Sequence, residues 1–369
     1  MHGIDRTGAV NAMRLGDIVG EALRNVATGT ARTFLLALML SALCVSLVCF
    51  DGLIARNALE RATAFVASGG STLVLNSKNG IDGRRCDNLS SLSNVQASGA
   101  TRARDSKVVA RALPSSGIPT FEVTTGFLRV LNAEPTAGRM GVYVSSQVSD
   151  ELALHGGDRL PSTKGDIPVA GTFTHPDDGR RGGYQYSVLF PSVPSGGYDE
   201  CWVSVWPQDG SIASLLSLVA LTPTTDSEPP TLSQLNSTGG VRFDGGDDYQ
   251  ERPSRFSDIA AAIGALLLGV GAIRLRRLSL ASARHLGMGA TAQTLMLVIE
   301  YLLCGLVAVV LTAQALVWCV SGLNTADVPA VLANLVRIPI AGLIGGLAGT
   351  VIGVTLVRER QFYRYFTTR

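Results

Sequence analysis

The stretch Phe34–Phe50, FLLALMLSALCVSLVCF, is the first of four long apolar runs in this chain of 369 residues. The other three crowd into the last third, at Ile259–Ile273, Leu295–Val320 and Ile338–Val357. A membrane-spanning helix needs about 20 mostly apolar residues, so each run predicts a crossing. The intervening segment, roughly 200 residues long, holds no run of spanning length. The sequence thus predicts one crossing, a large water-exposed domain and then three crossings.

The expected fold is a membrane protein with four transmembrane helices (1+3) and an extracytoplasmic α+β domain between the first and the second. A hydrophobic content of 46%, a charged content of 16% and a mean hydropathy of +0.28 fit such a mixed chain. The expected segments are a disordered N-terminus 1–12, a cytosolic interfacial helix 13–30, spans 31–55, 256–274, 294–320 and 337–357, an outer domain 56–255, a cytosolic loop 275–293, an outer loop 321–336 and a cytosolic tail 358–369.

Arginine placement predicts the orientation in the membrane, because cytosolic flanks are enriched in Lys and Arg. The loop between the second and third runs carries four arginines and no acid, whereas the segment Ser321–Val336 has Asp327 and no basic residue. Both termini and the arginine-rich loop are therefore expected in the cytosol. The segment 56–255, with 18 basic and 21 acidic residues, is expected outside. The loop arginines are Arg274, Arg276, Arg277 and Arg284.

The overall composition indicates a bacterial origin and argues against binding to nucleic acid. Arg outnumbers Lys 28 to 3, which is typical of a GC-rich bacterial genome, so the expected location is a bacterial plasma membrane. A net charge of only +2 gives no sign of nucleic-acid binding.

A cleaved signal peptide is the alternative interpretation of the first apolar run, Phe34–Phe50. It is disfavoured because no small-x-small site follows Phe50.

The six cysteines divide by predicted compartment. Four lie in the spans, where a thiol behaves as a small apolar group. Cys86 and Cys201 alone lie in the outer domain, and in an oxidising compartment they favour one disulfide. Two buried free thiols are the alternative. The cysteines of the spans are Cys44, Cys49, Cys304 and Cys319.

Apolar residues before the first span recur at helical spacing and form one stripe. Such a helix on the basic side is expected to lie in the membrane interface. A bend at Gly29–Thr30 is favoured over one long continuous helix, because both residues weaken helix continuity. After the span, Leu53–Ser68 is expected to be helical. The stripe is Leu15, Ile18, Val19, Ala22, Leu23 and Val26.

The outer domain alternates short β-prone and helical segments between Gly, Pro, Ser and Asp. The segment Thr222–Arg255 resembles a linker with one strand at Val241–Phe243. Expected strands are 71–75, 107–110, 120–125, 141–144, 167–173, 186–190 and 202–206, and expected helices are 126–131, 146–154 and 212–220.

No catalytic motif is present in the sequence. There is no G-x-x-x-x-G-K-[ST] loop to cradle phosphate and no G-x-S-x-G elbow. His175 with Asp177 and Asp178 fits a turn better than a metal site. The acids Asp244, Asp247 and Asp248 lack the spacing of a calcium loop. The chain is therefore expected to be no enzyme and to bind no cofactor of its own.

An acidic residue and a series of glycines inside the predicted spans are candidates for a functional or packing role. Glu300 lies within an apolar run, where an ionisable group is a functional candidate, although anchoring of a helix end or bonding to a neighbouring helix is equally open. The last span has glycines at small-xxx-small spacing, which permits close helix contact within the chain or between chains. These glycines are Gly342, Gly345, Gly346, Gly349 and Gly353.

Three stretches give the chain a resemblance to MacB/FtsX-type (type VII) ABC transporter permeases. The first is EALRN at 21–25 with ARTFL at 31–35. The second is VTTGFLRVL at 123–131 with AGR at 137–139, VS at 144–145, LHGGDRL at 154–160 and VAGTF at 169–173. The third runs from Arg276-Arg277 to RHLGMGA at 284–290, with Glu300 where the family often has Glu. Two departures are Leu278-Ser279, near where the family has Glu, and the tail.

The resemblance implies a MacB-like periplasmic core and a permease subunit that transmits the work of a separate cytosolic ATPase, which holds ATP and Mg, to its outer domain. It further implies a second permease copy or paralogue, and leaves room for an extracellular lipoprotein or adaptor. An ordinary positive-inside loop is the alternative to ATPase docking, and a membrane-anchored sensor or scaffold is the alternative function. The expected coupling residues are Arg276, Arg277, Leu280, Arg284, Leu286 and Met288, with Leu278 and Ala281 in the same apolar knob.

Overall fold

The computed structural model describes residues 15–27, 33–136, 138–221 and 229–356 and divides the chain into two compact units. The first comprises Met1–Leu59 and Gly246–Arg369, and the second Glu60–Gly245. The expectations for 1–12, for the bend at Gly29–Thr30 and for the tail 358–369 fall outside the described residues.

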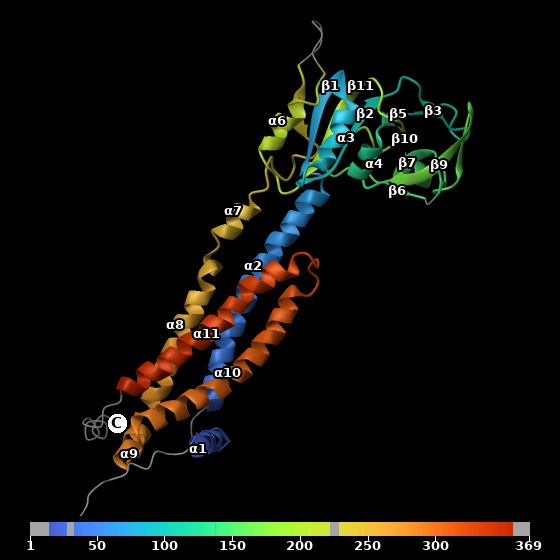
Figure 1. Ribbon diagram of the computed structural model, residues 1–369. Coiled ribbons are helices and arrows are strands. Elements are labelled where there is room, and N and C mark those ends of the chain that lie inside the picture. Colours follow the sequence, from blue (N-terminus) through green and yellow to red (C-terminus); the bar gives the residue numbers. More distant parts are fainter. Residues whose placement is uncertain (1–14, 28–32, 137, 222–228, 357–369) are drawn as a thin grey trace, which may run out of the picture. The chain divides into compact units, whose positions relative to one another are not determined.

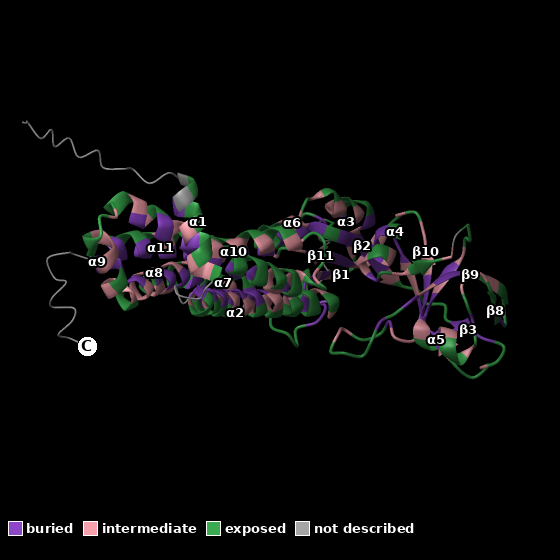
Figure 2. Cartoon of the chain, turned by 90° about the horizontal axis from the view of Figure 1, so that it is seen from below, coloured by how far each residue is buried: buried purple, intermediate pink, exposed green. Residues whose placement is uncertain are grey.

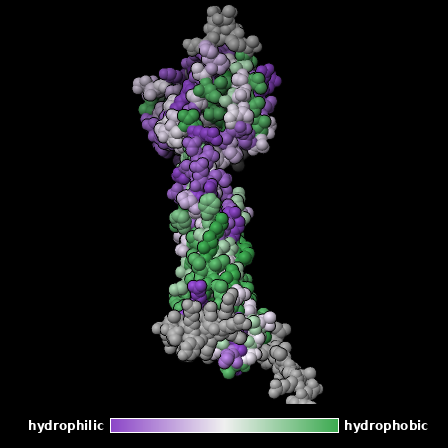
Figure 3. Space-filling model, turned by 90° about the vertical axis from the view of Figure 1, so that its left-hand side faces the viewer, coloured by the Kyte–Doolittle hydropathy of each residue, from purple (hydrophilic) through white to green (hydrophobic). Residues whose placement is uncertain are grey.

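The first unit is helical (Figure 1). Within the described ranges, four helical segments are long and apolar enough to cross a membrane: Thr33–Ala67, Gly245–Leu275, Ala290–Val320 and Val328–Leu356. Hydrophobic side chains, green in Figure 3, form a band over the visible face of this helical unit. The helices are α1 (Leu15–Ala27), α2 (Thr33–Ala67), α7 (Gly245–Gln250), the 3-10 helix η2 (Pro253–Phe256), α8 (Ser257–Leu275), α9 (Arg277–His285), α10 (Ala290–Val320) and α11 (Val328–Leu356).

The glycine stripe of α11 packs against α8 of the same chain. A Cβ added at Gly345 would lie 2.1 Å from the carbonyl oxygen of Ala262, and one at Gly349 would lie 2.2 Å from that of Leu266. On the α8 side of the same contact, a Cβ added at Gly269 would lie 2.6 Å from the carbonyl oxygen of Gly346. Only glycine permits such backbone contact. The choice left open by the sequence is thus settled as an intrachain contact for these positions.

The last helix begins earlier than the apolar run indicates. The sequence predicts an outer loop over 321–336, but α11 starts at Val328. Its first turns, VPAVLANLV at 328–336, are mostly apolar, with Val331 and Leu335 buried one turn apart, but Asn334 and the exposed Arg337 separate them from the longer apolar run. A search for continuous apolar residues misses this pattern, whereas the spacing of four residues identifies it.

The second unit is built on a mixed sheet. In the described residues its strands run in the order β12-β1-β11-β2-β5-β10-β7-β9-β6, with β8 paired to β9, and β3 pairs separately with β4. The β5/β10 and β7/β9 pairs are parallel and the other pairs are antiparallel. The strands are β1 (Thr72–Asp82), β2 (Val95–Ala103), β3 (Val108–Val109), β4 (Gly117–Ile118), β5 (Thr120–Val123), β6 (Glu134–Pro135), β7 (Val142–Ser145), β8 (Arg159–Ser162), β9 (Gly165–Phe173), β10 (Val188–Pro191), β11 (Gly197–Val205) and β12 (Thr231–Gln234).

Buried residues, purple in Figure 2, lie along the strands, and their alternation supplies both faces of this sheet with core residues. On β11, Cys201 and Val203 pack into one cluster, while Trp202 between them packs into the opposite one. Helices α3 and α6 cover the first face and α4 covers the second. The helices are α3 (Gly83–Asn88), the 3-10 helix η1 (Leu89–Ser91), α4 (Thr125–Val130), α5 (Ser146–Glu151) and α6 (Ser211–Ser217).

Cys86 on α3 and Cys201 on β11 form a disulfide, with Cα atoms 5.9 Å apart. Both residues are fully buried in the cluster under α3 and α6. The bond fastens the helix to the central part of the sheet. Of the two arrangements that the sequence left open, the structure contains the bonded one.

Two sequence expectations for the second unit are corrected. The strand expected at Val241–Phe243 is absent from the described structure, and Thr231–Gln234 forms β12 beside β1 instead. The segment before α8 is therefore no plain linker, because it adds an edge strand to the sheet. Strand β2 was not expected, since its sequence, VQASGATRA, consists largely of small and polar residues.

Candidate functional site

Helix α9, between α8 and α10, contains three of the six residues expected to couple to an ATPase, and the other three lie directly beside it. Its N-terminal Arg276 donates to Glu300 Oε2 of α10 at 2.5 Å. Asn25 of α1 donates to the other carboxylate oxygen at 2.9 Å. Glu300 is buried, so its charge is balanced by Arg276 in a setting where an unpaired carboxylate is costly. The glutamate thus bonds to neighbouring helices, one of the roles left open by the sequence.

A second polar contact fixes the C-terminal half of α9. Arg284 Nε donates to Gln293 Oε1 at 2.6 Å, and Gln293 Nε2 donates to the Leu280 carbonyl oxygen at 2.9 Å. Arg284 also reaches the carbonyl oxygen of Val354 at 3.3 Å. Because Gln293 is fully buried, these bonds satisfy polar atoms that water does not reach. Arg276 and Arg284 therefore hold α9 in place within the chain.

The expectation that Leu280 faces a partner is corrected by its burial. Leu280 is 3% exposed, and it packs with Ala281 against residues of α1, α8, α10 and α11. Its apolar surface is already covered by the same chain. The other members of this cluster are Ile18, Ala22, Ile273, Met296, Leu297 and Val354.

Leu286 is the expected coupling residue that the structure leaves open. Its side chain is 88% exposed, directly after α9. Gly287 follows with φ +98°, and the Met288 amide donates to the Ala283 carbonyl oxygen, which together turn the chain out of the helix. Arg277 and Met288 are half-buried. The turn thus presents an apolar side chain beside the basic residues of α9.

A buried polar group that sequence reasoning missed lies at the other end of the helical unit. Asp51 of α2 accepts from Arg252 Nε at 2.9 Å and from the Ser254 hydroxyl at 2.5 Å. The Arg252 guanidinium also lies 3.7 Å from the centre of the Tyr249 ring. These contacts fix the segment before α8 against α2. The available signal was an acid at position 51, directly after the apolar run.

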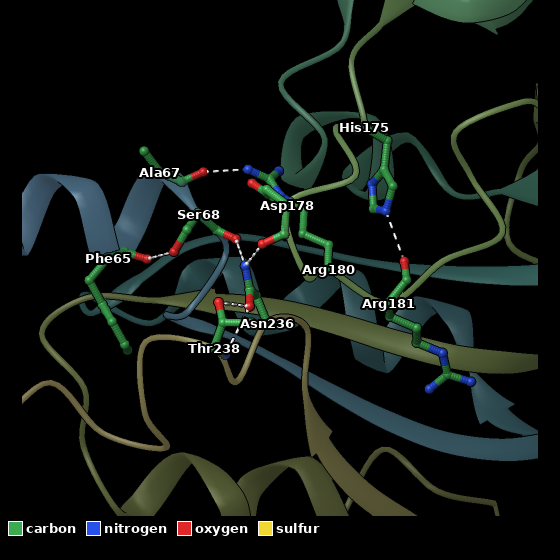
Figure 4. A network of polar contacts seen from close by, with 9 residues as sticks. All are labelled: Phe65, Ala67, Ser68, His175, Asp178, Arg180, Arg181, Asn236 and Thr238. Carbon is green, nitrogen blue, oxygen red and sulfur yellow. Dashed lines mark hydrogen bonds and ion pairs between the residues drawn. The ribbon is translucent and has the colours of Figure 1, made fainter.

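The two chain connections of the second unit meet at Asn236 (Figure 4). The Asn236 side chain donates to the carbonyl oxygen of Ser68, just after α2, at 3.0 Å and to that of Asp178 at 3.2 Å. Arg180 donates to the Ala67 carbonyl oxygen at 2.6 Å, which places a cation at the helix C-terminus. We call Ala67, Ser68, Asp178, Arg180 and Asn236 the junction.

An aromatic cluster supports the junction. Phe65 of α2 packs against Trp206 and Phe243, with ring centres 6.3 and 5.5 Å away. The Phe243 amide donates to Gln208 Oε1 at 3.0 Å. The helix that enters the unit and the segment that leaves it are therefore joined by both polar and apolar contacts.

His175 lies beside the junction segment and is buried. Its Nε2 bonds to the carbonyl oxygen of Arg181 at 2.9 Å, while Nδ1 has no hydrogen-bond partner among the described residues. Burial lowers the pKa of His175, and the hydrogen bond to Arg181 opposes this effect. The ring is therefore neutral in the folded unit and packs near Tyr184 and Trp202.

Comparison with known proteins gives partial structural similarities. No protein-family model matches the chain. No curated protein matches it. The periplasmic region of MacB from Actinobacillus actinomycetemcomitans aligns at 13% identity over 41% of this chain and 83% of that chain, with a TM-score of 0.31.

Two further solved structures align over a similar share of the chain. A permease-protein domain from Porphyromonas gingivalis aligns at 13% identity over 44% of this chain and 94% of that chain, with a TM-score of 0.30. The extracellular domain of the ABC-type transporter YknZ from Gram-positive bacteria aligns at 14% identity over 39% and 88%, with a TM-score of 0.27. No family is assigned to the chain from these alignments.

Proposed function

We propose that this chain is the permease subunit of a MacB/FtsX-like ABC transporter, driven by a separate cytosolic ATPase. The observation that carries the proposal is Leu286, which is exposed directly after α9, whereas Arg276, Leu280 and Arg284 are held by contacts within the chain. An ATPase groove would bury this leucine, and Arg277 would lie close to acids of the partner. ATP and Mg belong to the partner chain.

The proposed orientation places α9 in the cytosol and the second unit outside. The arginines around α9 support it, because cytosolic flanks favour basic residues. The Cys86–Cys201 disulfide supports it independently, since such bonds persist in oxidising compartments. The four apolar helices then cross the plasma membrane in the 1+3 order, among membrane lipids.

Work passes from the ATPase to the outer unit through stiff helices in this proposal. Closure of the ATPase moves α9, and the Glu300–Arg276 pair passes that movement to α1 and α10. Helix α2 runs without a break from Thr33 to Ala67, so it links the membrane region with the junction. The outer unit would then export, release or activate a peptide, lipophilic molecule, haem, lipoprotein or extracellular partner, in a dimer with a second permease copy or paralogue.

Leu286→Asp tests the docking step. Burying a leucine contributes about 1.5–3 kcal/mol, so the substitution should weaken the ATPase complex by about 10- to 100-fold and remove permease-dependent ATPase stimulation. Co-purification with a Walker A ATPase from a neighbouring reading frame, together with ATP turnover in detergent, measures both effects. Leu218→Asp is the matched control, because Leu218 is 66% exposed in the second unit and should leave both values unchanged.

The alternative, a membrane-anchored sensor or scaffold, makes the opposite prediction. If Leu286→Asp binds and stimulates the ATPase as the unaltered chain does, the docking assignment is wrong. If no neighbouring reading frame encodes a Walker A motif and no ATPase is stimulated, the scaffold becomes the better account.

A further inference from the structure

Strand β12 forms one edge of the large sheet and is open to pairing. It pairs with β1 through residues 231–234, and among the described residues no other strand lies on its far side. In an antiparallel pair, alternate residues direct their backbone N–H and C=O groups away from the partner strand. Those groups of β12 are thus free to bond to an added strand.

The edge strand lacks the usual protection against pairing. Natural sheets blunt their edges with charged residues or proline. The opposite edge follows this rule, because β6 contains Pro135 and spans two residues. In contrast β12 reads Thr-Leu-Ser-Gln, with no charge and no proline, and its first three residues are exposed.

A groove of about 350 Å³ lies beside this edge. Its floor includes Leu73 and Ile212, and its rim includes the exposed Leu232 of β12 and Val241. Val241 is 81% exposed and Leu232 is 45% exposed, so both present apolar surface at the groove. The groove thus offers an apolar site next to a row of unpaired backbone groups.

Arg242 gives the groove a charge preference. It lines the groove, is exposed, and its guanidinium makes no hydrogen bond or ion pair within the described part of the chain. The acid on the same groove, Asp209, is already bonded to the Ser211 amide at 3.1 Å and hydroxyl at 2.7 Å. Asp209 keeps its charge in these bonds, so the group of the groove that has no partner among the described residues is the Arg242 guanidinium.

We propose that the β12 edge and its groove bind an extended polypeptide segment of a partner protein by strand addition. Backbone pairing supplies the affinity, one apolar side chain of the segment fills the groove, and an acidic residue on the same face of the segment pairs with Arg242. The proposal stands on the second unit alone and does not depend on the ATPase.

Fluorescein-labelled nine-residue peptides of alternating Thr and Val test this surface against the full chain in detergent micelles. The central residue is Leu or Ser, and the residue two places later is Asp or Lys, because such positions share a face of a strand. Fluorescence polarisation should show saturable binding of the Leu/Asp peptide below about 1 mM, and binding weaker by about tenfold for each replacement. N-methylation of alternate backbone amides should abolish binding, because it removes the donors that pair with β12.

Variants of the chain complete the test. Val241→Glu should weaken binding of the Leu/Asp peptide by about tenfold or more, and Arg242→Glu should reverse the preference so that the Leu/Lys peptide binds better. Val193→Glu is the control, since Val193 is 85% exposed outside the groove, and it should change nothing. Absence of saturable binding by all four peptides, indifference to N-methylation, or indifference to both groove variants would overturn the proposal. ATPase stimulation is measured separately, so failure of this proposal and failure of the ATPase coupling are distinguishable.

Discussion

Gly99 and Gly126 let β2 and α4 approach each other at the level of their backbones. A Cβ at Gly99 would lie 1.9 Å from the Phe127 amide nitrogen, and one at Gly126 would lie 2.0 Å from the Ser98 carbonyl oxygen. Neither obstacle is a flexible side chain, so the backbone itself would have to move. These two glycines therefore determine how closely the helix covers the sheet.

Gly99→Ala should destabilise the second unit by about 1–3 kcal/mol through overpacking. Denaturant unfolding followed by tryptophan fluorescence measures the change, because Trp202 and Trp206 lie in this unit. Gly210→Ala is the matched control: its added Cβ meets nothing within 4 Å, and its φ of −62° suits alanine. Equal midpoints for both variants would contradict the close approach.

His175 should make the stability of the second unit depend on pH. Its lowered pKa means that, as the pH falls below the ordinary value of 6.5, the unfolded chain binds a proton before the folded one. The stability that comes from keeping His175 neutral is therefore fully present above pH 6.5, and it is lost as the pH falls through the lowered pKa. His175→Asn should flatten the slope of unfolding free energy against pH between 6.5 and the lowered pKa. A slope unaffected by His175→Asn contradicts the assignment.

At the scale of elements, α8 and α11 form the closest helix pair of the first unit. Gly349→Ala should force them apart, because the added methyl group meets the Leu266 backbone. Overpacking of about 1–3 kcal/mol predicts a lower midpoint of thermal unfolding in detergent. Gly271→Ala on α8 meets nothing within 4 Å and should keep or raise the midpoint. A tolerated Gly349→Ala would mean that the pair can separate without cost.

Elements with strong local signals could be predicted from the sequence, and elements stabilised by their surroundings could not. Helix α4 and strand β9 follow from local propensity, and both occur close to the expected bounds. Strand β2 has small residues because α4 lies directly against it, which is a tertiary reason that propensity does not contain. The start of α11 was missed because Asn334 and Arg337 separate its first apolar turns from the longer apolar run.

Of the residues expected to contact an ATPase, the sequence could identify only those whose exposure follows from the neighbouring residues in the chain. Leu286 could be singled out as an exposed apolar residue in a basic loop, but Leu280, six positions earlier, is buried by four other helices. The hydrogen-bond partners of Glu300 likewise cannot be predicted from residue spacing, since Asn25 lies 275 positions away in the sequence. Which helices meet is decided by packing of the whole unit, and a single sequence does not state it.

At the scale of the whole molecule, the disulfide belongs to one unit only. It closes a loop with a sequence separation of 115 residues, for which chain entropy predicts a stabilisation of about 4–5 kcal/mol. Cys86→Ala with Cys201→Ala should lower the denaturant midpoint reported by Trp202 and Trp206. The circular-dichroism signal of the helical first unit should keep its own denaturant midpoint, because Cys86 and Cys201 both lie in the second unit.

Mass spectrometry of the intact chain provides the check on the bond itself. Alkylation before and after reduction should differ by two reactive thiols from the second unit. Two thiols that react without reduction would rule out the disulfide and remove the basis of the double-variant prediction.

The contact between Asn236 and Ser68 also bears on how this chain could have arisen. Ser68 and Asn236, which flank residues 69–235 of the second unit, lie within one hydrogen bond of each other, 3.0 Å apart. Segments whose ends are adjacent can be inserted into a host protein with little strain on it. Residues 69–235 thus have the form of a cassette, and recombination could exchange it for another while the flanking helices stayed as they are.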